Sequence, residues 1–204
     1  MGRVGRITSG LACAALLALA SPAIAQFSDS YNFIKAVKDR DGEKVMSYLN
    51  KPGQPVLNTR DGESGDTALL LVTRGHDSTY ANFLLARGAD PNLRDKSGNP
   101  PLNVAAQTGD IEIARLLIGS RANVNATNNS GETALIIAVQ HRDAAMTRLL
   151  ISAGANPAIA DTIAGKSARD YASEDRRGNA MLKILDEAKP KIDPSKISGP
   201  ILPH

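Results

Sequence analysis

Three segments of the chain repeat with a fixed period of 33 residues, and this regularity constrains the fold more than any other feature. Residues 67–72 (TALLLV), 100–105 (PPLNVA) and 133–138 (TALIIA) align at that spacing. A glycine precedes each segment, and pairs of apolar residues recur in register further along each unit. Such self-similarity is typical of a solenoid, in which each unit buries its apolar face against its neighbours.

The start of each aligned segment is predicted to begin a short helix. Thr67 and Thr133 can cap this helix, because their hydroxyl groups accept hydrogen bonds from amides that have no partner within the helix. Pro100 and Pro101 occupy the equivalent place in the middle unit, and proline suits the first turn of a helix. Each unit therefore begins with a turn and a first helix.

A second helix is predicted later in each unit. Ile113 and Leu117 lie on one face at helical spacing. Gly88 and Gly154 follow the corresponding helices, where a glycine adopts a left-handed conformation at little cost. Each unit is thus expected to contain a turn, a helix, a second turn and a second helix.

These features resemble the ankyrin repeat, whose pattern runs D-x-x-G-x-T-P-L-H-x-A and then L-L-x-x-G-A-D-x-N. Asp95 to Asn125 is the closest unit, and residues 88–92 (GADPN) match the end of the unit before it. Two degenerate units, around residues 33–49 and 165–185, resemble end caps. The resemblance implies an all-α ankyrin-repeat solenoid over residues 26–188, with about five repeats near 31–58, 61–93, 94–126, 127–160 and 161–188.

The chain departs from the family pattern at the histidine of the T-P-L-H segment. Leu70, Asn103, Ile136 and Asp170 occupy that position. The hydrogen bonds that this histidine makes between neighbouring repeats must be lost or rebuilt, so we expect weaker stacking and end repeats that unfold first. Residues 50–66 are long and rich in Pro, Gly, Asn and Asp, which predicts an irregular first junction.

The first 25 residues have the features of a secretory signal peptide. Arg3 and Arg6 form a basic start, residues 11–20 form an apolar run, and Ala23-Ile24-Ala25 resembles a cleavage site. The run is shorter than the roughly 20 apolar residues that span a bilayer. We expect cleavage before Gln26 and export to the periplasm by the general secretory route, with secretion as the alternative.

Removal of residues 1–25 would leave 22 basic and 21 acidic residues and no cysteine. A nearly neutral chain has no overall electrostatic attraction to nucleic acid or to an anionic membrane. A chain without cysteine suits an oxidising compartment. We expect no stable membrane insertion, because no later stretch is long and apolar enough. Residues 189–204 contain four prolines and are predicted to form a flexible tail, with a docking peptide as the alternative.

The sequence carries no signature of a nucleotide or metal site. Residues 165–167 (GKS) match the last three positions of the phosphate-binding loop motif. Ala160, however, stands where that motif requires its first glycine. His76 and His141 are expected in solvated turns, far apart in the sequence and without neighbouring metal ligands. No cofactor and no metal are therefore predicted.

The acidic residues give no indication of catalysis. Asp110, Glu112, Asp143 and Asp175 are expected at exposed helix starts, where acids complement the helix dipole. No nucleophile motif of the G-x-S-x-G type is present. The chain is therefore predicted not to be an enzyme.

The resemblance implies a scaffold that binds an unidentified protein partner on its concave face, as a monomer. In this family, hairpin tips and inner helices carry recognition. By register, the candidate partner-binding residues are Glu63, Asp66 and Arg74 in the second repeat; Arg94, Lys96, Ser97, Asn99, Gln107 and Thr108 in the third; and Asn129, Ser130, Glu132, Gln140 and His141 in the fourth. Arg74 and Arg94 are the preferred anchors, because arginine is enriched at interface hot spots.

Two alternatives stay open. Some exported bacterial ankyrin proteins serve as accessory or stabilising factors for an exported enzyme, including in oxidative-stress defence, and this chain resembles them. An enzyme or small-ligand binder would instead need a deep apolar cavity with convergent polar groups.

Overall fold

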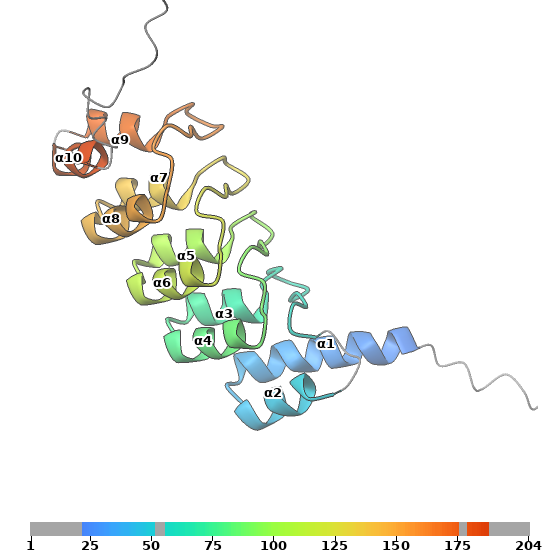
Figure 1. The fold of residues 1–204 in the computed structure, drawn as a ribbon. Coiled ribbons are helices and arrows are strands. Elements are labelled where there is room, and N and C mark those ends of the chain that lie inside the picture. Colours follow the sequence, from blue (N-terminus) through green and yellow to red (C-terminus); the bar gives the residue numbers. More distant parts are fainter. Residues whose placement is uncertain (1–21, 52–55, 176–178, 188–204) are drawn as a thin grey trace, which may run out of the picture.

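The computed structural model describes residues 22–51, 56–175 and 179–187 of the chain. This part of the chain forms ten α-helices in five consecutive pairs and no β-strand longer than an isolated bridge (Figure 1). The pairs are α1 (Pro22–Lys38) with α2 (Gly42–Leu49), α3 (Ala68–Arg74) with α4 (Ser78–Ala86), α5 (Pro101–Thr108) with α6 (Ile111–Gly119), α7 (Ala134–Gln140) with α8 (Ala144–Ser152), and α9 (Ala168–Glu174) with α10 (Asn179–Glu187).

The helix pairs stack side by side into two layers. In the inner layer, α1, α3, α5, α7 and α9 pack in succession, and in the outer layer α4, α6, α8 and α10 do the same. The loops that enter α3, α5, α7 and α9 project from the same side of the stack (Figure 1). The predicted all-helical repeat solenoid is confirmed.

The predicted caps of the inner helices are confirmed. The Thr67 hydroxyl accepts a hydrogen bond from the Leu70 amide at 3.3 Å, and the Thr133 hydroxyl accepts one from the Ile136 amide at 3.2 Å. Pro101 is the first residue of α5. Each cap satisfies an amide that would otherwise have no partner at the start of the helix.

The outer helices begin and end with their own local signals. Asp77, Asp110 and Asp143 cap α4, α6 and α8 through their side chains. Gly88 and Gly154 follow α4 and α8 with φ angles of +90° and +91°, as predicted. Each helix pair is therefore delimited by residues of its own repeat.

The core repeats with the same period as the sequence. Each of the three central repeats buries a leucine at one equivalent position of its inner helix and another at one equivalent position of its outer helix, and burial of such a side chain contributes about 2 kcal/mol. These almost completely buried residues are Leu69, Leu102 and Leu135 on the inner helices, and Leu84, Leu117 and Leu150 on the outer helices. Because the residues recur every 33 positions, each repeat adds one layer to a continuous core.

The first repeat differs from the others. Its inner helix α1 has 17 residues, whereas α3 has seven, so it is longer than the short first helix that the pattern predicts. Helix α1 begins at Pro22 and so includes four residues of the predicted signal peptide. The rest of that segment, and the predicted tail at residues 189–204, lie outside the described residues. No helix that the structure describes is long and apolar enough to cross a membrane.

Candidate functional site

The candidate residues come from two parts of each repeat, which together we call the inner face. It consists of the loop tips before α3, α5, α7 and α9 and the C-terminal ends of these inner helices (Figure 1). The structure divides the candidates into two groups. Some form contacts between repeats, and others are exposed to solvent.

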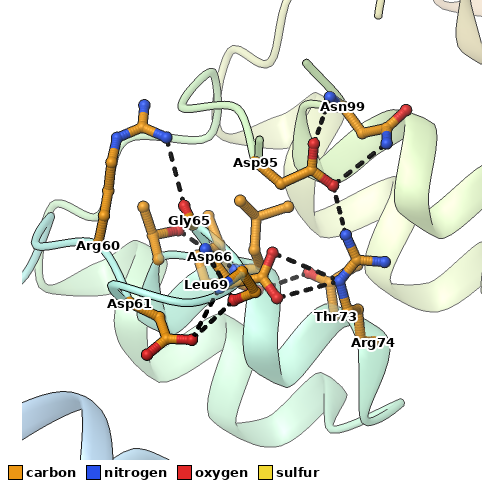
Figure 2. A network of polar contacts seen from close by, with 12 residues as sticks. Arg60, Asp61, Gly65, Asp66, Leu69, Thr73, Arg74, Asp95 and Asn99 are labelled. Atoms are coloured by element: carbon orange, nitrogen blue, oxygen red, sulfur yellow. Dashed lines mark hydrogen bonds and ion pairs between the residues drawn. The ribbon is translucent and has the colours of Figure 1, made fainter. Parts of the chain in front are cut away.

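Arg74 connects the second and third repeats. Its Nε lies 3.3 Å from Asp66 Oδ2, and its Nη2 binds Asp95 of the next loop (Figure 2). The carboxylate side chains of Asp66 and Asp95 are each only 5% exposed, so the guanidinium compensates two nearly buried charges. Asp95 also accepts hydrogen bonds from Asn99, which hold the third loop closed. Arg74 is therefore engaged within the chain.

A second arginine, which is not among the candidates, lies at the same junction. Arg60 donates to the main-chain carbonyls of Gly65 and Arg94. Arg94 therefore contributes a backbone carbonyl to this junction, whereas its side chain is exposed. Both predicted arginine anchors are exposed residues, but the Arg74 guanidinium is paired with Asp66 and Asp95.

Neighbouring loop tips are joined by a repeated main-chain hydrogen bond. The amides of Lys96, Asn129 and Thr162 donate to the carbonyls of Ser64, Ser97 and Ser130, respectively. The distances are 3.3, 3.1 and 2.9 Å. The loop tips of the second to fifth repeats are therefore linked in series.

Side chains reinforce this series of loop contacts. The Lys96 ammonium donates to the carbonyls of Gly62 and Glu63 in the preceding loop. Asn129 donates in turn to the Lys96 carbonyl at 3.2 Å. The candidates Lys96 and Asn129 thus hold the shape of the inner face.

Glu132 belongs to the group that connects repeats. Its carboxylate accepts a hydrogen bond from Asn128 at 2.9 Å, and Asn128 also donates to Asn99 in the third repeat. The main-chain carbonyl of Glu132 accepts from the buried side chain of Asn103 at 2.9 Å. Asn103, which replaces the family histidine, thus rebuilds a hydrogen bond between repeats at this junction.

Four candidates form an exposed row on the third and fourth repeats. Gln107 and Thr108 end α5, and Gln140 and His141 lie at the same positions one repeat later, at the end of α7. All four residues are exposed. Among the fourteen candidates, Gln107, Thr108, His141, Glu63, Ser97 and the Arg94 side chain offer exposed polar groups that a partner can contact. Gln140 is also exposed, and its side chain hydrogen-bonds Tyr171 of the fifth repeat.

Two side-chain contacts between neighbouring repeats, made by residues of the turns that follow α3 and α7, differ from the expectations. His76 lies in a turn as predicted, but its Nδ1 is 3.1 Å from Asp110 Oδ2 in the next repeat, so it is not simply solvated. Asp175 was expected at a helix start, and it instead follows the end of α9. It pairs there with Arg142, because the turn after α7 directs this arginine toward the next repeat.

The fifth repeat holds a buried carboxylate that sequence reasoning missed. Asp161 is 5% exposed and accepts a hydrogen bond from the Tyr171 hydroxyl at 2.7 Å. This hydrogen bond and those from nearby amides lower the pKa of Asp161. The same bond raises the pKa of Tyr171, because the protonated hydroxyl is needed to donate. The family pattern places an aspartate such as Asp161 at the start of a repeat, but it gives no indication that Tyr171 would donate a hydrogen bond to it.

Within the described residues, no group of three or more histidine, cysteine or acidic side chains is arranged to hold a metal ion. The polar side chains of the inner face are instead distributed over successive repeats. This arrangement provides an extended surface for contact.

Comparison with known proteins agrees with the fold. A family model described as "Ankyrin repeats (3 copies)" matches residues 33–128 and 69–161. The chain is 36% identical over 64 residues to the Nuclear factor NF-kappa-B p110 subunit of Drosophila melanogaster, and 35% identical over 75 residues to Oxysterol-binding protein homolog 1 of Saccharomyces cerevisiae. These matches span 31% and 35% of this chain but only 6% of each relative.

Proposed function

This chain belongs to the ankyrin-repeat family, and we propose that it is a non-catalytic scaffold that binds another protein through its inner face in the cell envelope. The exposed row at the ends of α5 and α7 carries the proposal. Gln107, Thr108, Gln140 and His141 present amide, hydroxyl and imidazole groups at equivalent positions of adjacent repeats. A partner that follows the stack can contact all four.

The contacts between repeats support this role, because they hold the exposed row in a fixed geometry. The loops on either side are joined through Lys96 and Asn129, and the two inner helices pack directly on each other. A surface that is ordered before binding loses less entropy when the partner arrives. The exposed row carries few charges at neutral pH, so we expect affinity to depend only weakly on salt.

Affinity capture tests the proposed face. Tagged mature protein is used as bait in an envelope extract, beside a Gln107→Glu/Gln140→Glu variant. The matched control is Arg115→Gln/Arg148→Gln, which makes the same change in net charge on exposed positions of the outer helices α6 and α8.

We expect one protein to be retained by the wild type and by the outer-helix control, and to be lost with the inner-face variant. Titration of that purified protein by calorimetry then establishes direct binding. Equal retention by the two variants would contradict the inner face as the binding surface.

Action in the cell envelope is supported by the pattern of the first 25 residues. Cell fractionation with mass measurement of the intact protein tests it. A mature chain that begins at Gln26 in the periplasmic fraction is expected, and it would retain residues 26–38 of α1. A full-length chain confined to the cytoplasmic fraction would contradict this part of the proposal.

A further inference from the structure

Two large apolar side chains are exposed among the described residues, and they come from opposite ends of the stack. Tyr31 on α1 is 68% exposed, and Ile163 in the loop before α9 is 81% exposed. Helix α1 extends toward the side from which the loops project, and the loop before α9 is the last of these loops (Figure 1). The exposed row at the ends of α5 and α7 therefore lies between an aromatic group and an aliphatic group.

Tyr31 lies on the side of α1 that corresponds to the exposed row. Lys38 precedes the left-handed Arg40 by two residues, and Gln140 precedes the left-handed Arg142 by two residues, so Lys38 and Gln140 are equivalent. Tyr31 precedes Lys38 by seven residues, which is about two turns of an α-helix. Its ring therefore belongs to the inner face, about two turns nearer to the loop tips than the exposed row.

Tyr31 stands where the next repeat buries a small capping residue. It precedes the left-handed Arg40 by nine residues, as Thr67 precedes the left-handed His76. Thr67 caps α3 and is only 1% exposed. In the first repeat no loop enters at this point, because α1 continues back to Pro22. The long α1 thus exposes an aromatic ring that a regular repeat does not have.

Ile163 departs from the repeat pattern in the same way at the other end. Ser64, Ser97 and Ser130 precede it at intervals of 33 residues, and their carbonyls accept the hydrogen bonds that join the loop tips. The Ile163 amide donates to Asp161 at 2.9 Å, so its backbone is held in place. A fixed loop tip thus carries an exposed isoleucine where the preceding tips carry serine.

Both groups suit contact with a partner. Burial of apolar surface is the main favourable contribution to most protein association, and tyrosine is enriched among the residues that dominate binding energy. One group is held on a helix and the other in a fixed turn, so ordering them on binding costs little entropy. A partner that lies on the exposed row gains affinity by reaching both ends.

The separation of the two groups indicates the shape of such a partner. Helices α1, α3, α5, α7 and α9 pack in succession. Neighbouring helices pack about 8–10 Å apart, so the four steps from α1 to α9 cover roughly 32–40 Å. An extended chain advances about 3.3–3.6 Å per residue, so a segment of roughly 10–12 residues spans that length.

We propose that the protein partner binds as an extended segment along all five repeats, with one apolar side chain against Tyr31 and another against Ile163. Neutral polar side chains between these two face the exposed row. This inference rests on the proposed function and adds the length of the contact and an apolar anchor at each end of it.

Photo-crosslinking of the full chain in its native cells tests the two anchors. The photoreactive residue p-benzoyl-phenylalanine replaces Tyr31, Ile163 or Gln107 in separate variants, and Arg148 on the outer helix α8 is the control position. We expect an adduct with the same protein from positions 31, 163 and 107, and none from position 148.

The other outcomes separate the two proposals. An adduct from position 107 without one from 31 or from 163 would overturn the anchored span and leave the proposed function intact. Crosslinks from 31 or 163 to the chain itself, or to a second copy, would also overturn the span. Absence of an adduct from position 107 would contradict the proposed function, on which the span rests.

Calorimetry with the purified adduct protein measures each anchor. Tyr31→Ser and Ile163→Ser should each weaken binding at least about fivefold, and the double variant by the product of the two factors, because distant contacts contribute independently. Tyr31→Phe and Ile163→Leu keep the apolar surface and should bind like the wild type. Ala164→Ser, on the same exposed tip, is the matched control. Unchanged affinity of either serine variant would overturn the corresponding anchor.

Discussion

The side-chain amide of Asn103 donates a 2.9 Å hydrogen bond to the main-chain carbonyl of Glu132 in the next repeat. Asn103 is 1% exposed and occupies the position where the family pattern has histidine. At the same position the second and fourth repeats place Leu70 and Ile136, which are fully buried. The chain thus uses a polar contact at one junction and apolar burial at the two neighbouring positions.

Asn103→Asp should therefore destabilise the central repeats. The carboxylate cannot donate to the Glu132 carbonyl and would be buried beside it, so we expect a loss of about 2–3 kcal/mol at pH 7. Its folded-state pKa would be raised, so the loss should diminish as the pH falls and the group becomes protonated. Urea unfolding at pH 7 and pH 4 measures this.

The matched control for that substitution is Asn123→Asp. Asn123 is exposed and its side-chain oxygen accepts from the Asn125 amide, a role that Asp90 has in the preceding repeat. We expect a change within about 0.5 kcal/mol. Equal effects of both substitutions would contradict the role of the Asn103 hydrogen bond.

Arg74→Gln should weaken the junction between the second and third repeats. The change leaves the nearly buried carboxylates of Asp66 and Asp95 without their cation, and we expect a loss of about 2 kcal/mol in the free energy of unfolding. Gln107→Ala changes the exposed residue at the same position one repeat later and should be nearly neutral. Chemical denaturation measures the free energy of unfolding of both variants. An Arg74→Gln variant as stable as the wild type would contradict a structural role for Arg74.

Gly131→Ala should weaken the contact between the loops of the fourth and fifth repeats. Gly131 has a φ angle of +77°, and a Cβ there would lie 2.6 Å from the Thr162 amide nitrogen. The left-handed backbone alone costs about 1 kcal/mol, and the clash adds to it. We expect a total loss above about 2 kcal/mol and faster hydrogen exchange at the Thr162 amide, which normally donates to Ser130.

Gly119→Ala is the control for that substitution. This glycine ends α6, has no φ in the left-handed region and has open space at its Cβ. Alanine should stabilise the helix by roughly 0.5 kcal/mol. A loss of stability comparable to that of Gly131→Ala would show that any added methyl group is harmful, and would contradict the steric explanation.

The fifth repeat should be sensitive to acid through Asp161. Its pKa is lowered by the Tyr171 hydrogen bond, so its contribution to stability is present above the ordinary aspartate pKa of about 3.9. That contribution is lost as the pH falls through the lowered folded-state value. The pKa of Tyr171 is raised, so its contribution is present below about pH 10 and lost at higher pH.

Tyr171→Phe should remove the Tyr171 part of this pH dependence and leave the part that comes from the amides that donate to Asp161. We expect the variant to be less stable than the wild type at pH 7 and the difference to shrink below about pH 4. Hydrogen exchange of α9 amides measures the effect, with Tyr31→Phe at a 68% exposed position as the control. A pH-independent difference would mean that the Tyr171 hydroxyl does not act through Asp161.

The helix pairs could be predicted from the sequence because their signals are local and periodic. Thr67 and Thr133 cap the helices that follow them directly, and Gly88 and Gly154 end helices in their own repeat. A solenoid needs only contacts between adjacent units, so repetition of one unit was enough to predict the stack.

The sequence by itself determined the repeat, its helices and its buried leucine positions, because each depends on residues close along the chain. The tertiary structure decided how each side chain is used. Arg74 and Arg94 were equivalent candidates and both are exposed, yet loop geometry pairs the guanidinium of Arg74 with Asp66 and Asp95, whereas Arg94 contributes its main-chain carbonyl. The period identifies which repeats are neighbours, but the direction of a side chain toward a partner some 30 residues away depends on how their backbones stack.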